Sequence, residues 1–216
     1  MALKLVVKGS NDHKKALSQL GDCPTSQRFV MVLGLKGIPF QIEYVDLNKN
    51  AKYKKLPVLE PGDREPIDNY EAIEDYIENN FPEPDLKIAE YSKADKAGQD
   101  LYSKFAKFMR NSNPKLDAKL RGDLNRELLK LNEFLENESP GAYLDGEKLK
   151  LPDCNLLPKL MHVKEAGELK GFTISQEYGG VLEYLKQATR QKVFRDTFTD
   201  QVKEGIKSGW WKKMGN

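Results

Sequence analysis

The chain has 216 residues, enough for one large domain or two small ones. Hydrophobic residues make up 39% and charged residues 31%, which is typical of a folded globular protein and excludes a largely disordered one. The net charge of +2, from 35 basic and 33 acidic side chains, argues against a protein that binds nucleic acid by neutralising phosphates.

Cysteine and histidine usage limits the chemistry further. The two cysteines, Cys23 and Cys154, lie far apart, which does not suit a disulfide framework and indicates a reducing compartment. With only two histidines besides, we expect no metal site. The chain starts with a strand pattern and shows no signal peptide, and its longest apolar run, 29–40, is too short and too interrupted to span a bilayer. We therefore expect a cytoplasmic protein.

The first part of the chain alternates between strand and helix patterns. The predicted elements are strands at 3–8 and 40–46 with a helix at 25–36 between them, short strands at 56–59 and 66–67, and a helix at 70–79. Gly37 and Pro39 supply the stop signal of the first helix. Pro57, at the start of a short strand, is a candidate cis proline. The order predicts a β-α-β unit with parallel strands, followed by β-β-α.

Residues 81–85, Phe-Pro-Glu-Pro-Asp, read as a linker, because two prolines remove two N–H donors and disfavour helix. Only helical patterns follow: apolar faces at 101–109 and 120–135, a central helix at 152–166, and helices at 176–188 and 199–207. We therefore expect an α/β domain at 1–80 and an all-helical domain at 86–216.

Cys23 is the residue around which the functional interpretation is built. It precedes Pro24, and proline is well suited to the first helical position, so Cys23 is expected at the N-cap. The free N–H groups and the dipole of a helix start favour a thiolate, which is nucleophilic. Ser26 replaces the second cysteine of a dithiol motif, so its hydroxyl is expected to hydrogen-bond the thiolate, and a second thiol must come from outside, with glutathione the obvious donor. The structural alternative is a buried cysteine without chemistry.

The segment 21–28, Gly-Asp-Cys-Pro-Thr-Ser-Gln-Arg, carries a family resemblance. It is similar to the active-site segment of plant-type dehydroascorbate reductases and chloride intracellular channel proteins, which usually read Gly-Asp/Asn-Cys-Pro-Phe-Ser-Gln-Arg. Thr25 departs from this pattern at the phenylalanine. The order of α/β module, proline linker and helical domain resembles the glutathione S-transferase fold. The resemblance implies a thioredoxin-like N-terminal domain that binds glutathione and an all-helical C-terminal domain.

Separate segments favour different branches of this superfamily. Residues 81–87, 159–162 and 209–213 are similar to the dehydroascorbate reductases, whereas 31–37 and 153–160 are close to the channel family. We prefer the reductase branch. The implied function is a glutathione-dependent dehydroascorbate reductase that works through Cys23 and a mixed disulfide. The alternative is a channel-like protein, soluble with glutaredoxin-like activity, whose segment 23–45 enters membranes.

The resemblance also implies the site residues and partners. Cys23 is the catalytic residue, and the residues expected to bind the acceptor substrate are Lys8, Asp22, Pro24 and Ser26. Those expected to bind glutathione, the co-substrate, are Lys49, Leu56, Pro57, Val58, Asp68, Asn69 and Tyr70. We expect a monomer with glutathione and dehydroascorbate as small-molecule partners, no nucleic acid, and a membrane only under the alternative.

Three departures from the shared pattern affect these expectations. The segment 48–55 is shorter than usual. The carboxylate–hydroxyl pair that receives the γ-glutamyl end of glutathione maps to Asn69-Tyr70 or, in a shifted register, to Asp68-Asn69. The capping box before the helix at 152–166 keeps Asp153 but has Lys150 in place of the hydroxyl residue, so half of that cap is lost.

Overall fold

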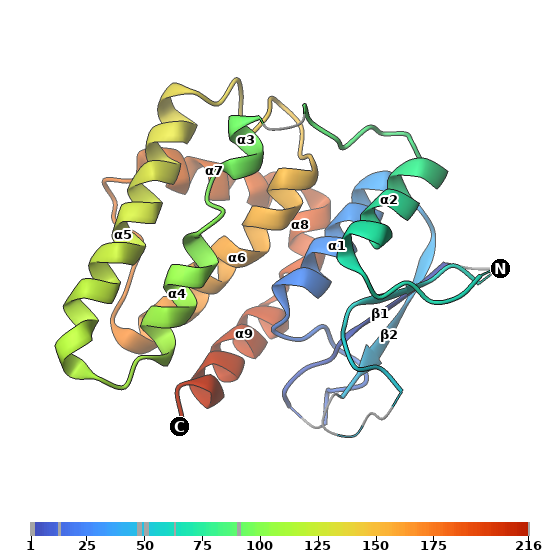
Figure 1. Ribbon diagram of the computed structural model, residues 1–216, viewed down its shortest axis with the longest axis horizontal. Helices are drawn as coiled ribbons and strands as arrows, with labels where there is room; N and C mark the ends of the chain where they lie inside the picture. Colours follow the sequence, from blue (N-terminus) through green and yellow to red (C-terminus); the bar gives the residue numbers. More distant parts are fainter. Residues whose placement is uncertain are drawn as a thin grey trace. The chain divides into compact units, whose positions relative to one another are not determined.

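The computed structural model describes residues 3–12, 14–46, 49, 52–62, 64–89 and 92–215 (Figure 1). By its contacts the chain divides into two compact units. The first comprises Met1–Leu86 and Val193–Gly205, and the second Lys87–Lys192 and Ile206–Asn216. The first contains the sheet, and the second is helical.

A three-stranded sheet forms the centre of the first unit. The strands are β1 (Leu3–Lys8), β2 (Phe40–Val45) and β3 (Val58–Glu60), in the order β2-β1-β3. β1 pairs parallel with β2 and antiparallel with β3, which confirms the predicted β-α-β unit. The short strand predicted at 66–67 amounts to a single bridge between Leu59 and Ile67. Leu5, Val6 and Val7 make β1 apolar on both faces, which suits the central strand of a sheet covered on both sides. All three are completely buried.

Helices α1 (Pro24–Lys36) and α2 (Tyr70–Asn80) lie side by side against this sheet (Figure 1). Between them Lys36 Nζ donates to Glu78 Oε2 at 2.9 Å, and both side chains are almost completely buried. The same ammonium donates to the carbonyl oxygen of Pro84 at 2.8 Å. The Lys36 ammonium therefore joins the linker to both helices. Removing either partner of this buried ion pair would leave an uncompensated charge.

Three charged side chains, one from each strand, form a network across the sheet. Lys4 Nζ lies 2.7 Å from both Glu43 Oε2 and Glu60 Oε2, and Tyr53 donates its hydroxyl to Glu60 Oε1 at 2.6 Å. Burial raises the pKa of Glu60, but the hydrogen bonds from Lys4, Tyr53 and Lys52 outweigh it and lower this pKa from 4.5 to about 2. The folded state therefore favours the ionised carboxylate.

This shift predicts how stability depends on pH. A carboxyl group whose pKa is lower in the folded state adds stability above its unfolded pKa, and this contribution disappears as pH falls from 4.5 to about 2. Glu60→Gln should lower the free energy of unfolding by about 1 kcal/mol at neutral pH, allowing for solvent screening, and should match the wild type near pH 2. Urea titrations followed by far-UV circular dichroism across this range test it. Glu65→Gln, at an exposed position, is the matched control, and a pH-independent difference would contradict the prediction.

The segment 193–205 differs from the predicted division, which had assigned all of 86–216 to the helical domain. It contains most of α8 (Lys192–Thr197) and the start of α9 (Asp200–Lys213), and it groups with the first unit. The physical reason is local packing. A Cβ on Gly34 of α1 would lie 2.7 Å from Val193 Cγ2, so Gly34 allows this close approach. Phe194 and Phe198 are buried with their ring centroids 4.8 Å apart.

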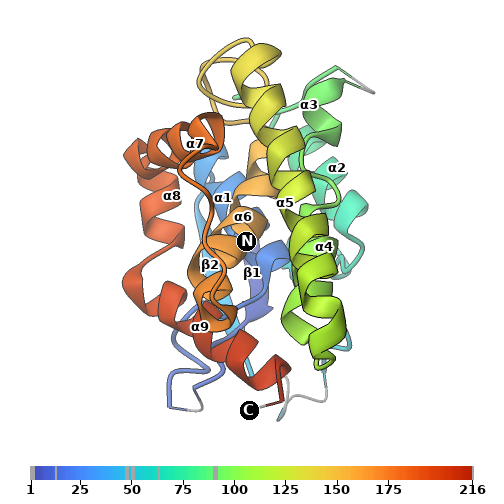
Figure 2. The same cartoon turned by 90° about the vertical axis from the view of Figure 1, so that its left-hand side faces the viewer.

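The second unit is built around α6 (Leu151–Gly167), which is buried on most sides, as predicted. The other helices are α3 (Lys93–Lys96), α4 (Leu101–Arg110), α5 (Pro114–Asn137), the 3₁₀ turn η1 (Glu168–Lys170) and α7 (Gly179–Arg190). Figure 2 shows α4 and α5 side by side, joined by a short turn. The sequence pattern located all but the short helices α3, α8 and η1.

The start of α6 is held by one buried carboxylate. Asp153 Oδ2 accepts from the Lys150 N–H at 2.9 Å, which is the half of the capping box that the sequence retains. Asp153 Oδ1 accepts from the Leu144 N–H at 3.0 Å and from the Tyr184 hydroxyl at 2.8 Å. Asp153 therefore joins α6, the preceding loop and α7.

The C-terminal part of α9 packs on the second unit through one of two adjacent tryptophans. Trp210 is completely buried and donates its indole N–H to the buried His162 at Nδ1, at 2.9 Å. Trp211 is 49% exposed. Within the described part of the chain, every helix is too short or too polar to cross a membrane.

Candidate active site

Cys23 is the N-cap of α1, as predicted, and its side chain is half-buried. Its Sγ accepts the backbone N–H of Ser26 at 3.5 Å, and Pro24 occupies the first helical turn. The sulfur therefore faces the positive end of the helix dipole and the first turn of α1. This geometry makes Cys23 the candidate nucleophile of the first unit.

The loop before Cys23 is fixed by a close approach to the end of β1. Gly21 N–H donates to the carbonyl of Lys8 at 2.9 Å, and a Cβ on Gly21 would lie 2.1 Å from the carbonyl oxygen of Gly9. Only glycine fits here, so the first residue of the motif has a steric role. The Gln27 side chain donates to the Gly21 carbonyl at 3.0 Å from a fully buried position, a support that sequence reasoning missed.

Ser26 acts differently from the expectation. The sequence predicted that its hydroxyl would hydrogen-bond the thiolate, whereas the contact to sulfur comes from its backbone N–H. The Ser26 Oγ instead accepts from the Lys8 N–H at 3.4 Å. The cause is the helical turn, which directs the Ser26 N–H at the N-cap and its side chain at the end of β1.

Lys8 and Asp22 form an ion pair beside the thiol. The Lys8 ammonium donates to Asp22 Oδ1, the Asp22 side chain is completely buried, and that of Lys8 is 22% exposed. The pair brings the end of β1 and the Cys23 loop together, and Lys8 is its partly exposed member.

Leu56 and Pro57 precede β3. The Leu56–Pro57 bond is cis, which confirms the prediction. Val58, which was expected to bind glutathione, has its peptide groups in the sheet. Leu59 exchanges hydrogen bonds with Ile67 at 2.9 and 2.8 Å, so by the alternation of an antiparallel ladder the peptide groups of Val58 face Val6 in β1. They are therefore engaged in the sheet and are not open to a ligand strand.

The residues expected at the γ-glutamyl end of glutathione are engaged within the protein. Asn69 caps α2, its Oδ1 accepting from the Ala72 N–H at 2.9 Å. Tyr70 donates its hydroxyl to the Leu56 carbonyl at 2.9 Å. Burial raises the pKa of Tyr70, and the negative charge of Cys23 raises it further, so the phenol stays protonated near the thiol.

Two predicted residues are not brought into these contacts. Asp68 is exposed. Lys49 is exposed in a turn, where its N–H donates to the Asp46 carbonyl at 3.0 Å. The shortened segment 48–55 lies partly outside the described residues. The structure therefore unites Lys8, Asp22, Cys23, Pro24 and Ser26 in one place, with Leu56, Pro57 and Tyr70 forming a second cluster.

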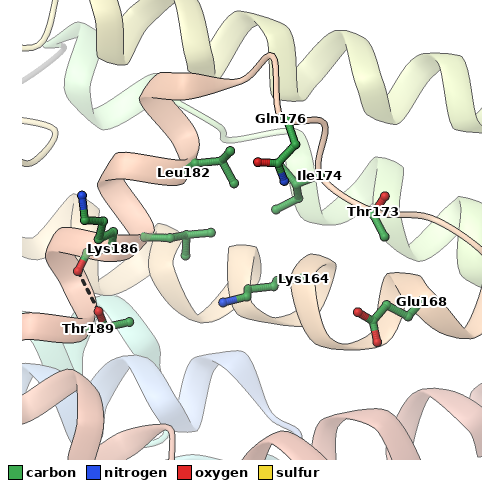
Figure 3. A pocket seen from close by; sticks show the side chains of 9 residues that line it. Lys164, Glu168, Thr173, Ile174, Gln176, Leu182, Lys186 and Thr189 are labelled. Carbon is green, nitrogen blue, oxygen red and sulfur yellow. Dashed lines mark hydrogen bonds between the residues drawn. The ribbon is translucent and has the colours of Figure 1, made fainter.

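A separate cavity of about 460 Å³ lies in the second unit (Figure 3). Its walls come from α6, η1, the loop at 173–176 and α7, and the residues that line it include Lys164, Lys186, Leu182 and Leu185. No sequence motif marks it, because its walls are three separate segments. Within the described part of the chain, no three His, Cys, Asp or Glu side chains gather to hold a metal ion.

Comparison with known proteins places this geometry in a family. Residues 1–84 match the family model described as the CLIC-like N-terminal domain. Chloride intracellular channel protein 3 of Homo sapiens is 34% identical to this chain, and the match covers 90% of each chain.

Two solved structures share the fold. A dehydroascorbate reductase of Chlamydomonas reinhardtii superposes with a TM-score of 0.85 at 24% identity, covering 99% of both chains. The channel homologue EXC-4 of C. elegans superposes with a TM-score of 0.83 at 22% identity, covering 100% of this chain and 83% of that one. These likenesses confirm the expected glutathione S-transferase fold.

The reductase likeness is thus one of fold, whereas the channel likeness extends to sequence over most of the chain. The preference for the reductase branch drawn from local segments is therefore less well supported than the alternative. The chain belongs to the chloride intracellular channel family.

Proposed function

We propose that this protein is a glutathione-dependent thiol oxidoreductase with Cys23 as its nucleophile, acting as a cytoplasmic monomer. The observation that carries the proposal is the hydrogen bond from the Ser26 N–H to Cys23 Sγ at the start of α1. A half-buried thiol in this position is a stabilised nucleophile, whereas Cys154 is completely buried within α6. Ser26 stands where a dithiol enzyme would have its second cysteine, so the second thiol must come from solution.

The proposed cycle is two thiol–disulfide exchanges. The Cys23 thiolate attacks the glutathione sulfur of a mixed disulfide, forming a Cys23–glutathione disulfide and releasing the other half as a thiolate. A second glutathione thiolate then attacks the glutathione sulfur of this adduct. It forms glutathione disulfide, and the electron pair of the broken bond returns to Cys23 as thiolate. No metal is needed at any step.

The surroundings of Cys23 fit the thiol end of glutathione better than its γ-glutamyl end. Lys8 offers an ammonium paired with Asp22, the residue before Cys23, and Leu56 lies just before β3. At the other end, the Tyr70 hydroxyl and the Asn69 side chain are engaged with the protein itself. We infer that glutathione binds only after Tyr70 exchanges its internal partner for the ligand, while Asp68 and Lys49 remain available at the surface.

Dehydroascorbate is the second proposed acceptor, and the Lys8–Asp22 pair is the observation that favours it. Adjacent carbonyl groups gain negative charge as they are reduced, and an ammonium beside the thiol can stabilise that charge. In this reaction one water and the Cys23 thiol give a sulfenic acid, and two electrons and two protons convert dehydroascorbate to ascorbate. Glutathione then condenses with the sulfenic acid, releasing water, and the second exchange above follows.

Variants at Lys8 can distinguish an effect on the acceptor substrate from an effect on the reactivity of the Cys23 thiol. Lys8→Ala alone would remove the ammonium that pairs with the buried Asp22 carboxylate, so the test uses Lys8→Met with Asp22→Asn, which removes both charges. Turnover of dehydroascorbate with glutathione should fall about tenfold or more, while alkylation of Cys23 by iodoacetamide stays within about twofold of wild type. Ascorbate formation and mass spectrometry measure the two rates. Equal losses in both would show that the pair acts on the thiol or on folding.

Membrane insertion is the alternative suggested by the relative's name, Chloride intracellular channel protein 3. Entry of 23–45 into lipid would pull α1 away from α2. That would separate Arg28 from Glu74 and Lys36 from the buried Glu78. Each freed cation costs roughly 2.5–3.5 kcal/mol at the bilayer centre. These contacts support the oxidoreductase as the function of the fold described here.

A further inference from the structure

The cavity in the second unit combines apolar and charged side chains in a volume suited to a small ligand. Its volume of about 460 Å³ lies within the usual range of small-molecule sites. Ile174 and Leu185, which line it, are buried, and Leu182 is half-buried. A ligand that places an apolar group against these side chains gains free energy by removing apolar surface from water.

Two lysines and one glutamate also line the cavity, and ion pairing distinguishes them. Lys186 Nζ lies 2.9 Å from Glu183 Oε2, so its charge is compensated. Lys164 and Glu168 have no ion-pair partner among the described residues, although they are only four positions apart. Lysine followed by glutamate is the weaker order for such a pair on a helix. The cavity therefore presents one unpaired ammonium and one unpaired carboxylate.

The other charged residues of the segment 164–170 are engaged away from the cavity. Glu165 Oε2 lies 3.9 Å from Lys207 Nζ. Lys170 Nζ lies 3.1 Å from Asp117 Oδ1. None of these four side chains lines the cavity. Within this fully described segment, the charged side chains without an ion-pair partner are thus the two that line the cavity.

The loop at 173–176 adds hydrogen-bonding groups to the same space. Thr173 and Gln176 line the cavity with exposed side chains that make no hydrogen bond to another described residue. Figure 3 shows Lys164 on the α6 side of the cavity, with Leu182 and Gln176 across from it. A hydroxyl and an amide can each donate and accept, so they suit a ligand that carries both kinds of charge.

We propose that this cavity binds a small zwitterion with an apolar side chain, of the size of an amino acid or a dipeptide. Lys164 binds the carboxylate of this ligand and Glu168 binds its ammonium, while its apolar side chain packs on Leu182 and Leu185. A ligand with one charge would leave either Lys164 or Glu168 uncompensated as it covered the cavity. The cavity belongs to the second unit and Cys23 to the first, so this proposal does not depend on the proposed oxidoreductase function.

Leucine and its analogues test the ligand class on the full chain. Leucine should shift backbone amide signals of residues 164–189 in two-dimensional NMR spectra, with a Kd on the order of 1 mM. Glycine lacks the apolar side chain and should bind at least about tenfold more weakly. N-acetyl-leucine lacks the ammonium and leucinamide lacks the carboxylate, so each should bind about fivefold more weakly than leucine. Leucylleucine keeps both charges farther apart, and comparing its Kd with that of leucine distinguishes a dipeptide site from an amino-acid site.

Variants at the two unpaired charges assign each end of the ligand. Glu168→Gln should weaken leucine binding about fivefold without weakening the binding of N-acetyl-leucine, which has no ammonium to lose. Lys164→Gln should weaken leucine binding to a similar extent without weakening that of leucinamide. Both positions are exposed, so the fold should persist. Lys119→Gln and Glu133→Gln are matched controls at exposed positions of α5 outside the cavity lining, and both should bind leucine as the wild type does.

Three results would overturn the proposal. The first is the absence of shifts in 164–189 at leucine concentrations well above the expected Kd. The second is binding of N-acetyl-leucine or leucinamide as tight as that of leucine, which would show that one charge suffices. The third is an equal loss of affinity in the control variants, which would show that the net charge of the protein acts rather than Lys164 and Glu168.

Discussion

Cys23→Ser is expected to reduce glutathione-dependent turnover to below detection. Serine keeps the N-cap geometry at the start of α1, because its hydroxyl can accept the Ser26 N–H that Cys23 Sγ accepts at 3.5 Å. The fold should therefore persist. A serine hydroxyl without an adjacent base is a poor nucleophile, and it cannot form a disulfide with glutathione. Assays with glutathione and either dehydroascorbate or a small disulfide measure the loss.

The second cysteine supplies the matched control. Cys154 is completely buried within α6, so Cys154→Ser should retain turnover and affect mainly stability. Mass spectrometry of protein treated with dehydroascorbate and one equivalent of glutathione should locate the adduct on Cys23. An adduct on Cys154, or full activity in Cys23→Ser, would exclude the proposed mechanism.

Asp153→Ala is expected to cause the largest loss of stability, about 3–5 kcal/mol in the free energy of unfolding of the second unit. The carboxylate is completely buried and accepts hydrogen bonds from the N–H groups of Lys150 and Leu144 and from the Tyr184 hydroxyl. Alanine would leave three donors without their acceptor and would remove the remaining half of the helix cap. Each buried donor left unpaired costs about 1–3 kcal/mol.

Two conservative variants show how much individual hydrogen bonds contribute to this loss of stability. Asp153→Asn retains one acceptor oxygen and should cost less than alanine, and Tyr184→Phe removes one donor and should cost about 1 kcal/mol. Both tryptophans lie in the second unit, so the fluorescence change in a urea titration reports its unfolding. Equal stability of the Asp153→Ala variant and wild type would show that these hydrogen bonds add no net stability.

Local signals in the sequence were sufficient for most elements. Alternating apolar residues marked β2, and the Cys-Pro and Gly37 signals marked both ends of α1. The long apolar faces marked α4, α5 and α6. These signals depend on the chain's own period and on residues within a few positions of a helix end. The short helices α3 and α8 escaped prediction because four to six residues are too few to show a period.

The sequence by itself also determined the N-cap position of Cys23, because an N-cap depends only on the residues around it. Tertiary structure decided the surroundings of that thiol. Three features join residues that are not neighbours in the chain. They are the hydrogen bond from the Lys8 N–H to the Ser26 hydroxyl, the contact of the Lys55 ammonium with the Tyr70 ring, and the grouping of 193–205 with the first unit. Such contacts depend on strand register and helix packing, which no local pattern specifies. The sequence therefore indicates the candidate nucleophile, whereas strand register and helix packing decide which side chains of β1, β3 and α2 lie near it.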